Sequence, residues 1–353
     1  MRQGDIKYIT SVLKGERPGC DCDWYDVLGF LCAHRVAGLF YKRAKGMNLP
    51  LPYKAENILS GIYYAQVRKN ILMRGYVGEL AQRMIETRTP CIFAKGSLLS
   101  NMLGPDAIYM DGERVSNDID IVVKSDGITA VTEILREEGY MQGWYDRTSQ
   151  KIIAYPRMEI LSRRMNRGET APFVKLTGNA ETPFIEVDVN FSLGSVPGEK
   201  SELLAEMVDS RRIYEGKTEL PAADAELFFL HLILHQYKES ALYFTVARGK
   251  DLDLYKLADI YYMWKSRLLD RTKLQTISEK YGVNGEVGAV LEQVGKVFND
   301  KTLRDTVYAG GKEQPEVIDY EKNRRYGWTV GITRRMCAFD GRKFLSPVKD
   351  DDR

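Results

Sequence analysis

The stretch that decides the fold is FAKGSLLSNMLGPDAIYMDGERVSNDIDIVV, residues 93–123. It begins in a predicted short strand, CIFAK (91–95), passes through two small residues, and continues into a helix predicted over LLSNML (98–103). The segment IDIVV (119–123) is rich in β-branched residues and predicts a second strand. Strand, helix and strand in such close succession indicate a mixed α/β core.

The sequence around this core is helical on both sides. Apolar residues recur at three- and four-residue intervals in four flanking segments, 24–45, 53–88, 222–238 and 252–269. Three more strands are predicted between these helices, at 151–155, 172–176 and 183–191. We therefore expect an α+β fold, in which a small mixed β-sheet is flanked by N-terminal and C-terminal helical regions.

We expect the chain to have four parts. They are an N-terminal helical region (1–90), an α/β core (91–195), a C-terminal helical domain (196–300) and a basic C-terminal tail (301–353). The tail alternates paired basic residues with Tyr326, Trp328 and Phe339. Such a composition either contacts an anionic partner or packs on the core as a solvated helix or hairpin, and we expect the tail to be only partly ordered.

Composition excludes several classes of protein. The 353 residues are 44% hydrophobic and 28% charged, as in an ordinary soluble globular protein rather than a disordered or fibrous one. The net charge of +2 is far from that of a protein that coats nucleic acid, so we expect no nucleic acid partner. The first residues lack a signal-peptide h-region, no apolar run has the length of a membrane helix, and the five cysteines form no disulfide framework. We expect a cytoplasmic protein without membrane contact.

Two acidic pairs have the spacing of a metal platform. Asp118 and Asp120 are two residues apart in a predicted strand, so both carboxylates project from one face and can share magnesium ions. In the later strand IEVDVNF (185–191), Glu186 and Asp188 share a face in the same way. That strand would supply the further carboxylate that a two-metal site requires.

A phosphate-binding turn is predicted just before the first acidic pair. A strand delivers Lys95, Gly96 and Ser97 into the start of a helix, where small residues let a phosphate approach free backbone N–H groups. Strand, Gly-Ser, helix, Asp-x-Asp strand and later acidic strand then follow one another in an order that is hard to produce by chance.

This order resembles the polymerase-beta-like nucleotidyltransferase superfamily. More narrowly, the chain resembles an uncharacterised bacterial nucleotidyltransferase family, which has Lys-Gly before the helix and an Arg shortly before Ser-Asp-hydrophobic-Asp. Here these positions are Lys95-Gly96 and Arg114 with SNDID (116–120). The resemblance covers about residues 24–270. It departs from the family at the inserted Asn117 and at the segment EVD (186–188), where relatives tend to have an acid, a hydrophobic residue and His.

The resemblance implies an enzyme that transfers a nucleoside monophosphate from an NTP, expected to be ATP, and releases pyrophosphate. The acceptor would be a hydroxyl or similar group of a small molecule or peptide, as in antibiotic modification or natural-product assembly. The alternative is an antitoxin-like regulatory protein that binds a protein partner and nucleotidylates it.

The resemblance also gives the acidic residues their expected roles. Two magnesium ions are expected on Asp118, Asp120 and a third acid. The resemblance favours Glu186 as that third acid and leaves Asp188, on the same strand face, as the alternative. The third acid would also accept the proton of the acceptor.

The phosphates of the NTP have their own expected contacts. Ser97 and the backbone after Gly96 would hold the β- and γ-phosphates. Lys95 or Arg114 would be the charge partner of these phosphates.

Histidines and cysteines raise further alternatives. His231 and Lys238 fall close to one stripe of an apolar helix, with Asp224 and His235, and this stripe either lines the acceptor side of the cleft or makes hydrogen bonds inside a helical bundle. The four-residue spacing of His231 and His235 also suits zinc, but the Glu of a metalloprotease helix is missing. A second zinc alternative rests on four residues of the N-terminal region, Cys20, Cys22, Cys32 and His34. If residues 24–45 are helical, the last two of these point in different directions.

Overall fold

The computed structural model describes residues 2–304, 306, 308 and 314–348. The chain divides into two compact units, and we describe each by itself. The first unit consists of residues 1–64, 232–265 and 275–353, and the second consists of residues 65–231 and 266–274. The second unit holds a mixed sheet of six strands, and helices lie toward both ends of the chain, so the predicted α+β class is confirmed. The four expected parts of the chain stay a prediction.

The sheet of the second unit positions the acidic residues. Its strands are β1 Cys91–Ala94, β2 Asp118–Val123, β3 Met141–Asp146, β4 Lys151–Ala154, β5 Phe173–Leu176 and β6 Phe184–Asn190. They lie in the order β1-β2-β6-β5-β3-β4, in which β2 and β6 are parallel and every other pair of neighbours is antiparallel. All four residues of β1 and the last five of β2 are buried. Aliphatic and β-branched side chains suit such a central position.

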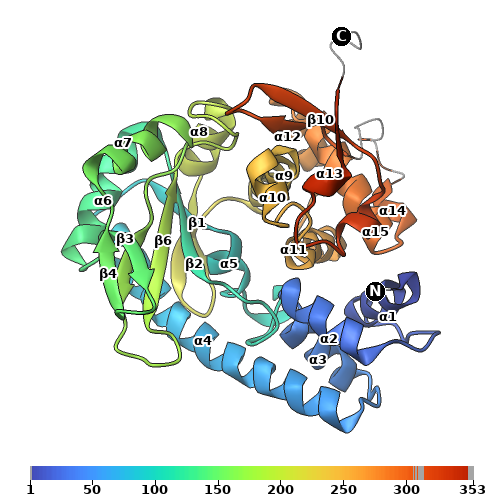
Figure 1. Ribbon diagram of the computed structural model, residues 1–353. Helices are drawn as coiled ribbons and strands as arrows, with labels where there is room; N and C mark the ends of the chain where they lie inside the picture. The colour runs from blue at the N-terminus through green and yellow to red at the C-terminus, as the bar shows by residue number, and fades with distance from the viewer. Residues whose placement is uncertain (1, 305, 307, 309–313, 349–353) are drawn as a thin grey trace. The chain divides into compact units, whose positions relative to one another are not determined.

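Short helices and a hairpin surround this sheet (Figure 1). They are α5 Lys95–Leu99, α6 Ile128–Glu137, α7 Arg157–Asn166 and α8 Ser201–Asp209, with β7 Arg212–Glu215 pairing with β8 Glu219–Ala222. Helix α5 packs against β1 and β2. The helix predicted over 98–103 is therefore α5, which begins three residues earlier and is shorter. Helix α6 buries Ile128, Val131 and Leu135 at helical spacing, which gives it one apolar face toward the core.

The first unit is mainly helical. Its helices are α1 Gln3–Lys14, α2 Trp24–Ala33, α3 Ala37–Gly46, α10 Tyr243–Ala247, α11 Leu254–Lys265, α13 Asn284–Val297, α14 Lys301–Arg304 and α15 Ile332–Arg335. Its three-stranded sheet has the order β11-β10-β9, with β9 Val317–Asp319, β10 Arg324–Trp328 and β11 Leu345–Pro347. The helix predicted over 24–45 is two helices, because Arg35 between them has the left-handed φ of 57°. Within the described residues, no helix combines the length and the apolar character needed to cross a membrane.

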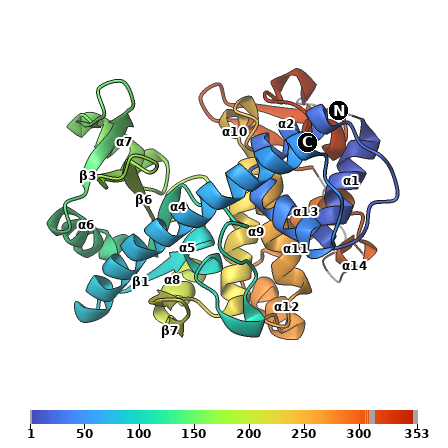
Figure 2. The same cartoon turned by 90° about the horizontal axis from the view of Figure 1, so that it is seen from below.

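Three helices contribute residues to both units: α4 Tyr53–Glu86, α9 Ala225–Ala241 and α12 Arg271–Lys280. Helix α4 is continuous over 34 residues and agrees closely with the helix predicted over 53–88 (Figure 2). Helices α9 and α11 likewise correspond to the periodic segments 222–238 and 252–269.

The basic tail contains an ordered, structural arginine. Arg335 is 3% exposed and pairs with Asp251, whose Oδ2 lies 2.5 Å from Arg335 Nη2. The same guanidinium lies 3.3 Å from the centre of the Trp328 ring and donates to Gln314 Oε1 at 2.8 Å. These contacts favour the packed alternative for this part of the tail, while residues 309–313 and 349–353 lie outside the described chain.

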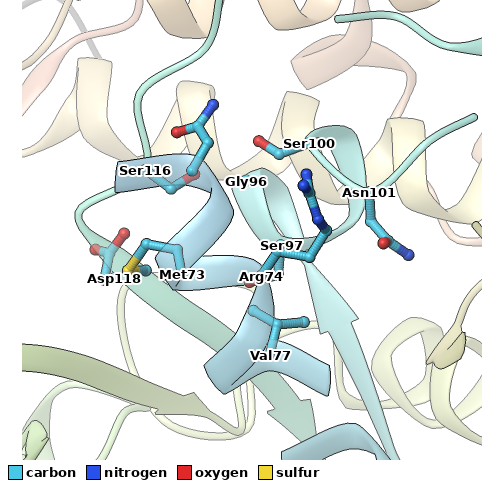
Figure 3. Close-up of a pocket in the computed structure, with 10 residues that line it drawn as sticks. Met73, Arg74, Val77, Gly96, Ser97, Ser100, Asn101, Ser116 and Asp118 are labelled. Atoms are coloured by element: carbon cyan, nitrogen blue, oxygen red, sulfur yellow. The ribbon is translucent and has the colours of Figure 1, made fainter. Parts of the chain in front are cut away.

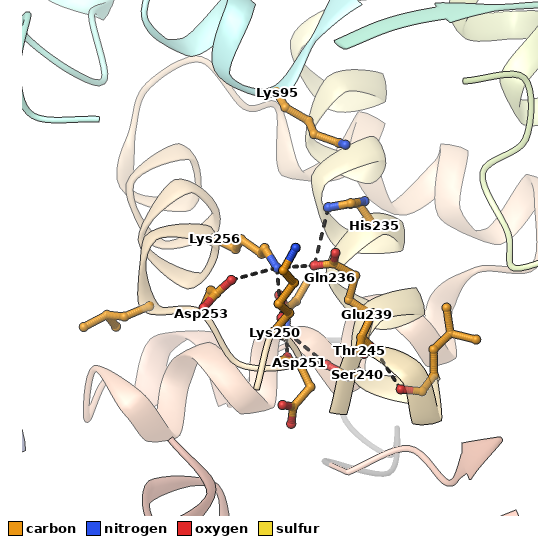
Figure 4. A network of polar contacts seen from close by, with 12 residues as sticks. Lys95, His235, Gln236, Glu239, Ser240, Thr245, Lys250, Asp251, Asp253 and Lys256 are labelled. Carbon is orange, nitrogen blue, oxygen red and sulfur yellow. Dashed lines mark hydrogen bonds and ion pairs between the residues drawn. The ribbon is translucent and has the colours of Figure 1, made fainter. Parts of the chain in front are cut away.

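Figure 4 shows a polar network inside the first unit. Lys256 Nζ donates to the carboxylate of Glu239, lies 3.2 Å from Asp253 Oδ2, and donates to Lys250 O at 2.9 Å. Burial alone would lower the pKa of Lys256, but the nearby carboxylates outweigh it and raise the pKa. These charges are compensated inside the unit, so the network stabilises the fold.

Candidate active site

The acidic residues of the two strands lie side by side. In the parallel pairing of β2 with β6, Asp118 is opposite Glu186 and Asp120 is opposite Asp188. Neighbouring strands lie about 4.8 Å apart, and paired residues of parallel strands point to the same side of the sheet. Asp120 is only 2% exposed, whereas the other three are half-buried. The four carboxylates therefore form an acidic row on one face of the sheet.

Lys95 provides positive charge beside this row. Because Ala94 is opposite Asp120 in the antiparallel pairing of β1 with β2, the next residue along the chain lies beside this carboxylate. Lys95 Nζ donates to Asp120 Oδ1 at 2.7 Å. Burial alone would lower the pKa of Lys95, but Asp120 and Asp118 outweigh it and raise the pKa, so the lysine remains charged. Its left-handed φ of 46° is rare for a lysine, and such backbone strain is concentrated at functional sites.

Crowding of carboxylates changes their proton affinity. Burial raises the pKa of Asp120 to about 6, with Lys95 opposing the shift and Asp118 adding to it. Burial also raises the pKa of Asp188 well above its usual range, and the negative charges of Asp118 and Asp120 add to that effect. Like charges held this close repel one another unless a cation lies among them.

The residues fit magnesium by their chemistry. Carboxylate oxygens are the ligands that this ion prefers, and four carboxylates face one side of two paired strands. Within the described residues, no three His, Cys, Asp or Glu side chains already converge on a point that could hold a metal ion. One carboxylate of the row, Asp120, is paired with the ammonium group of Lys95 instead.

Gly96 makes room for two buried side chains. A Cβ on Gly96 would lie 1.9 Å from Ser116 Oγ and 2.3 Å from Arg114 Nη1. Arg114 Nη1 donates to Ser116 Oγ at 2.8 Å, and both residues are buried. Asn70 of helix α4 holds the backbone of this segment by donating to Arg114 O at 3.0 Å. The space beside the Gly96 backbone is thus filled by the arginine that we expected to be a phosphate partner.

A small pocket adjoins the start of α5 (Figure 3). Its volume of about 20 Å³ is enough for about one water molecule. Ser97 and Ser100 line it, and the buried hydroxyl oxygens of both have no hydrogen-bond partner among the described residues. Buried hydroxyl groups normally have a partner, so these two are free to bind one. Asp118 and Arg74 also line the pocket, which places it between the acidic row and a basic side chain.

Two further basic residues were not predicted from the sequence. Arg74 and Lys217 both bind Asp111, each with a nitrogen 2.8 Å from its Oδ1. Burial alone would raise the pKa of Asp111, but the hydrogen bonds from these two cations lower it. Lys217 also donates to Ser100 O at 3.1 Å, so this cluster adjoins the serine-lined pocket. No motif in the sequence marked Arg74 or Lys217.

The other predicted ligands lie on helix α9 or in the first unit. His231 is buried and Lys238 is half-buried on α9, and their expected role on the acceptor side stays a prediction. His34 donates from Nε2 to Met336 O at 2.8 Å and accepts from Leu254 N–H at Nδ1. Both ring nitrogens are therefore used inside the fold. All five cysteines are free, and no zinc site is present among the described residues.

An acidic sheet face beside a half-buried lysine and a serine-lined pocket has the features of a site that transfers phosphate-containing groups. Residues 21–299 match the model of the family described as uncharacterised nucleotidyltransferase. This match extends over most of the chain, which therefore belongs to that family. Its members are transferases by description, and nucleotidyl transfer in general is the activity that the match supports. Neither the curated proteins nor the solved structures gave a match to this chain.

Proposed function

We propose that the protein is a magnesium-dependent nucleotidyltransferase that moves a nucleoside monophosphate from an NTP to a hydroxyl or similar group of a small molecule or peptide. The observation that carries the proposal is the acidic row, in which Asp118 and Asp120 are paired in register with Glu186 and Asp188. Family membership supports nucleotidyl transfer, and the row adds the donor set that the chemistry needs. The five free cysteines fit a reducing compartment such as the cytoplasm.

The roles of the acids follow from their positions. Asp118, Asp120 and Asp188 would hold magnesium, which when bound would neutralise charge on the transferring phosphoryl group. We favour Asp188 over Glu186 as the third acid, because Asp188 is opposite Asp120, the most buried member of the row. The charges of Asp118 and Asp120 also help to raise the pKa of Asp188.

The chemistry balances without a further co-reactant. The acceptor oxygen forms a bond to the α-phosphorus, and the bond from that phosphorus to the oxygen bridging to the β-phosphate breaks. Pyrophosphate leaves, and the proton of the acceptor hydroxyl passes to Asp188. The protein's contribution is mainly alignment and charge compensation, as is usual for phosphoryl transfer.

The phosphates would bind beside the start of α5, at the edge of the small serine-lined pocket, which itself has room for only about one water molecule. The unpartnered hydroxyl oxygens of Ser97 and Ser100 line the pocket beside Asp118, and Arg74 lies on its wall. Lys95 would exchange its bond with Asp120 for the phosphates once a metal ion neutralises that carboxylate. We expect ATP as the NTP.

The proposal is tested with α-labelled NTPs, offered one at a time with magnesium and a metabolite extract of the source organism. We expect pyrophosphate release and a labelled product. Asp120→Asn and Asp188→Asn should each lower turnover by about a thousandfold or more, the scale of charge-stabilising groups in phosphoryl transfer. Glu186→Gln should cost less.

Asp126→Asn is the matched control, because Asp126 is an exposed carboxylate just beyond the far end of β2. It should retain wild-type turnover. Near-normal turnover in Asp188→Asn combined with a dead Glu186→Gln would move the third acid to Glu186, and normal turnover in Asp120→Asn would remove the proposal.

A further inference from the structure

A larger cavity borders the acidic row on the β6 side. Its volume is about 800 Å³, within the range of small-molecule sites. Three parts of the chain enclose much of it: the residue just before β2, the turn of the β3–β4 hairpin, and the loop between β5 and β6. Residues that line it include Lys69, Asn117, Tyr145, Arg147, Phe184 and Glu186. Asn117 precedes Asp118, and Glu186 is opposite Asp118, so the cavity opens onto the acidic row.

The β3–β4 hairpin is built to reach this cavity. Strand β3 pairs with β5 only through Met141 and Gln142, and from Gly143 onward it pairs with β4. A Cβ on Gly143 would lie 2.3 Å from Ile153 O, so only glycine allows the close approach at the start of the hairpin. Tyr145 then stacks on Phe184 of β6 with ring centres 4.7 Å apart. This contact places a pair of aromatic rings at the wall of the cavity.

The opposite side of the cavity is fixed by an ion pair. Glu181, in the loop between β5 and β6, accepts two hydrogen bonds from Arg68 of α4, at 2.7 and 3.0 Å. Both residues are exposed, so the energy of this pair is modest, but its two-pronged geometry sets the position of the loop. The carboxylate of Glu181 is thereby already paired.

The lining of the cavity holds two cations, Lys69 and Arg147, and two carboxylates, Glu181 and Glu186. Lys69 Nζ donates to the neutral amide oxygen of Asn117 at 2.7 Å. Arg147 is exposed at the hairpin turn and makes no ion pair or hydrogen bond with any residue that the structure describes. The acids of the lining are Glu181, paired with Arg68, and Glu186, a member of the acidic row. A guanidinium without a partner beside stacked aromatic rings suits a flat ring that carries an anionic group.

We propose that this cavity binds the acceptor, and that the acceptor carries a carboxylate or phosphate group that pairs with Arg147. The inference rests on the proposed function, because the cavity is assigned to the acceptor by its border with the acidic row. The ring of the acceptor packs on Tyr145 and Phe184, and its hydroxyl lies at the end of the cavity formed by Asn117 and Glu186. The start of α5 borders Asp118 from the side of the serine-lined pocket, and the phosphates of the NTP would lie on that side, outside this small pocket.

Three matched probes test the charge preference directly. They are 4-(hydroxymethyl)benzoate, 4-(hydroxymethyl)benzamide and 4-(hydroxymethyl)benzylamine, which share a ring and a hydroxyl but differ in charge. Their dissociation constants are measured by NMR titration of the full chain without ATP. We expect the benzoate to bind about tenfold more tightly than the amide. This is the gain in affinity that one hydrogen bond to a charged group provides. The amine should bind most weakly.

Two variants of the β3–β4 hairpin test whether Arg147 causes the preference for the benzoate. Arg147→Gln should remove the preference for benzoate over the amide and leave ATP binding unchanged. Lys151→Gln is the matched control, because Lys151 is an exposed cation of the same hairpin that does not line the cavity, and it should retain the preference. Equal binding of the three probes, no binding of any of them, or an Arg147→Gln variant that keeps the preference would overturn the inference.

The outcomes separate this inference from the proposed function. If Arg147→Gln weakens ATP rather than the benzoate, the cavity is the nucleotide site and the acceptor assignment is wrong. If the benzoate preference depends on Arg147 but no NTP is ever turned over, the cavity is an anion-selective ligand site and the proposed function fails. Nucleotidyl transfer to acceptors without an acidic group would leave the function standing and overturn the inference about the acceptor.

Discussion

Position 96 requires glycine because two side chains occupy the space that a Cβ atom would take. Arg114 and Ser116 meet there, joined by a hydrogen bond of 2.8 Å, and both are buried. Their loop leads directly to Asp118, so the geometry of the acidic row depends on how closely this loop can approach α5. A side chain at position 96 would push the loop away.

Replacing Gly96 with alanine should therefore destabilise the protein. The new Cβ would lie 1.9 Å from Ser116 Oγ and 2.3 Å from Arg114 Nη1, and both of these residues are buried. We expect a loss of about 1–3 kcal/mol in the free energy of unfolding, the usual cost of overpacking. Denaturant titration measures it.

Gly75→Ala is the matched control for this substitution. Gly75 is an exposed position inside helix α4, and nothing lies within 4 Å of its Cβ position. Alanine is favoured over glycine inside a helix by about 1 kcal/mol, so this variant should be as stable as the wild type or more stable. Equal stability of the two variants would contradict the packing role of Gly96.

Some site residues could be predicted from the sequence and others could not. The two-residue period of a strand suffices to place Asp118 and Asp120 on one face. The ion pair of Lys95 with Asp120 depends on the register of two strands, which local sequence does not specify. The left-handed φ of this turn lies at Lys95, a residue type that seldom adopts it, so the sequence does not mark it.

His34 connects three elements of the first unit. It follows α2, receives a hydrogen bond from Leu254 N–H at the start of α11, and donates to Met336 O just after α15. The ring also contacts Phe30, with ring centres 4.0 Å apart. This pattern requires the neutral ring with its proton on Nε2, because Nδ1 must accept a hydrogen bond.

The stability of the protein should fall as the pH drops below the ordinary pKa of histidine. Burial lowers the pKa of His34 in the folded state; the contact with Met336 O and the charge of Asp253 oppose the shift, and that of Lys256 adds to it. The unfolded chain therefore binds a proton more readily than the folded chain. Stability is fully present above about pH 6.5 and is lost as the pH falls from there toward the folded-state pKa.

This dependence is measured as the free energy of unfolding at pH 7.5 and pH 5.5. The wild type should be less stable at the lower pH, and His34→Gln, which cannot be protonated, should show a smaller change. Because the variant disturbs two buried hydrogen bonds, it should also lose about 1–3 kcal/mol at the higher pH. An unchanged pH profile in the variant would show that His34 does not contribute to the acid sensitivity.

Periodicity predicted the long helices well and the breaks poorly. Pro52 and Pro90 enclose the segment 53–88, and α4 covers nearly all of it. The break between α2 and α3 has no glycine or proline to mark it, since the left-handed residue there is Arg35. Strand β3 was not predicted at all, because Gly143 interrupts its sequence where the hairpin needs a close backbone approach.

At the scale of the whole molecule, each unit is assembled from distant segments of the chain. The first unit combines residues 1–64 with 232–265 and 275–353, and its contacts join His34 to residues 220 and 302 positions away. Hydrophobic periodicity carries no information on such pairings. The sheet, in contrast, is built from residues 91–190, which is why all its strands except β3, and its acidic face, could be found by reading along the sequence.

We expect the acidic row to act as a metal platform for a nucleotide. The direct test is a titration with manganese(II), followed by its EPR signal, with and without a non-hydrolysable ATP analogue. We predict that the wild type binds the ion, more tightly with the analogue, and that Asp120→Asn weakens binding about tenfold or more, as loss of a ligand should. Asp126→Asn should bind like the wild type. A wild-type protein that binds no manganese in the presence of the analogue, or an Asp120→Asn variant with unchanged affinity, would contradict the claim.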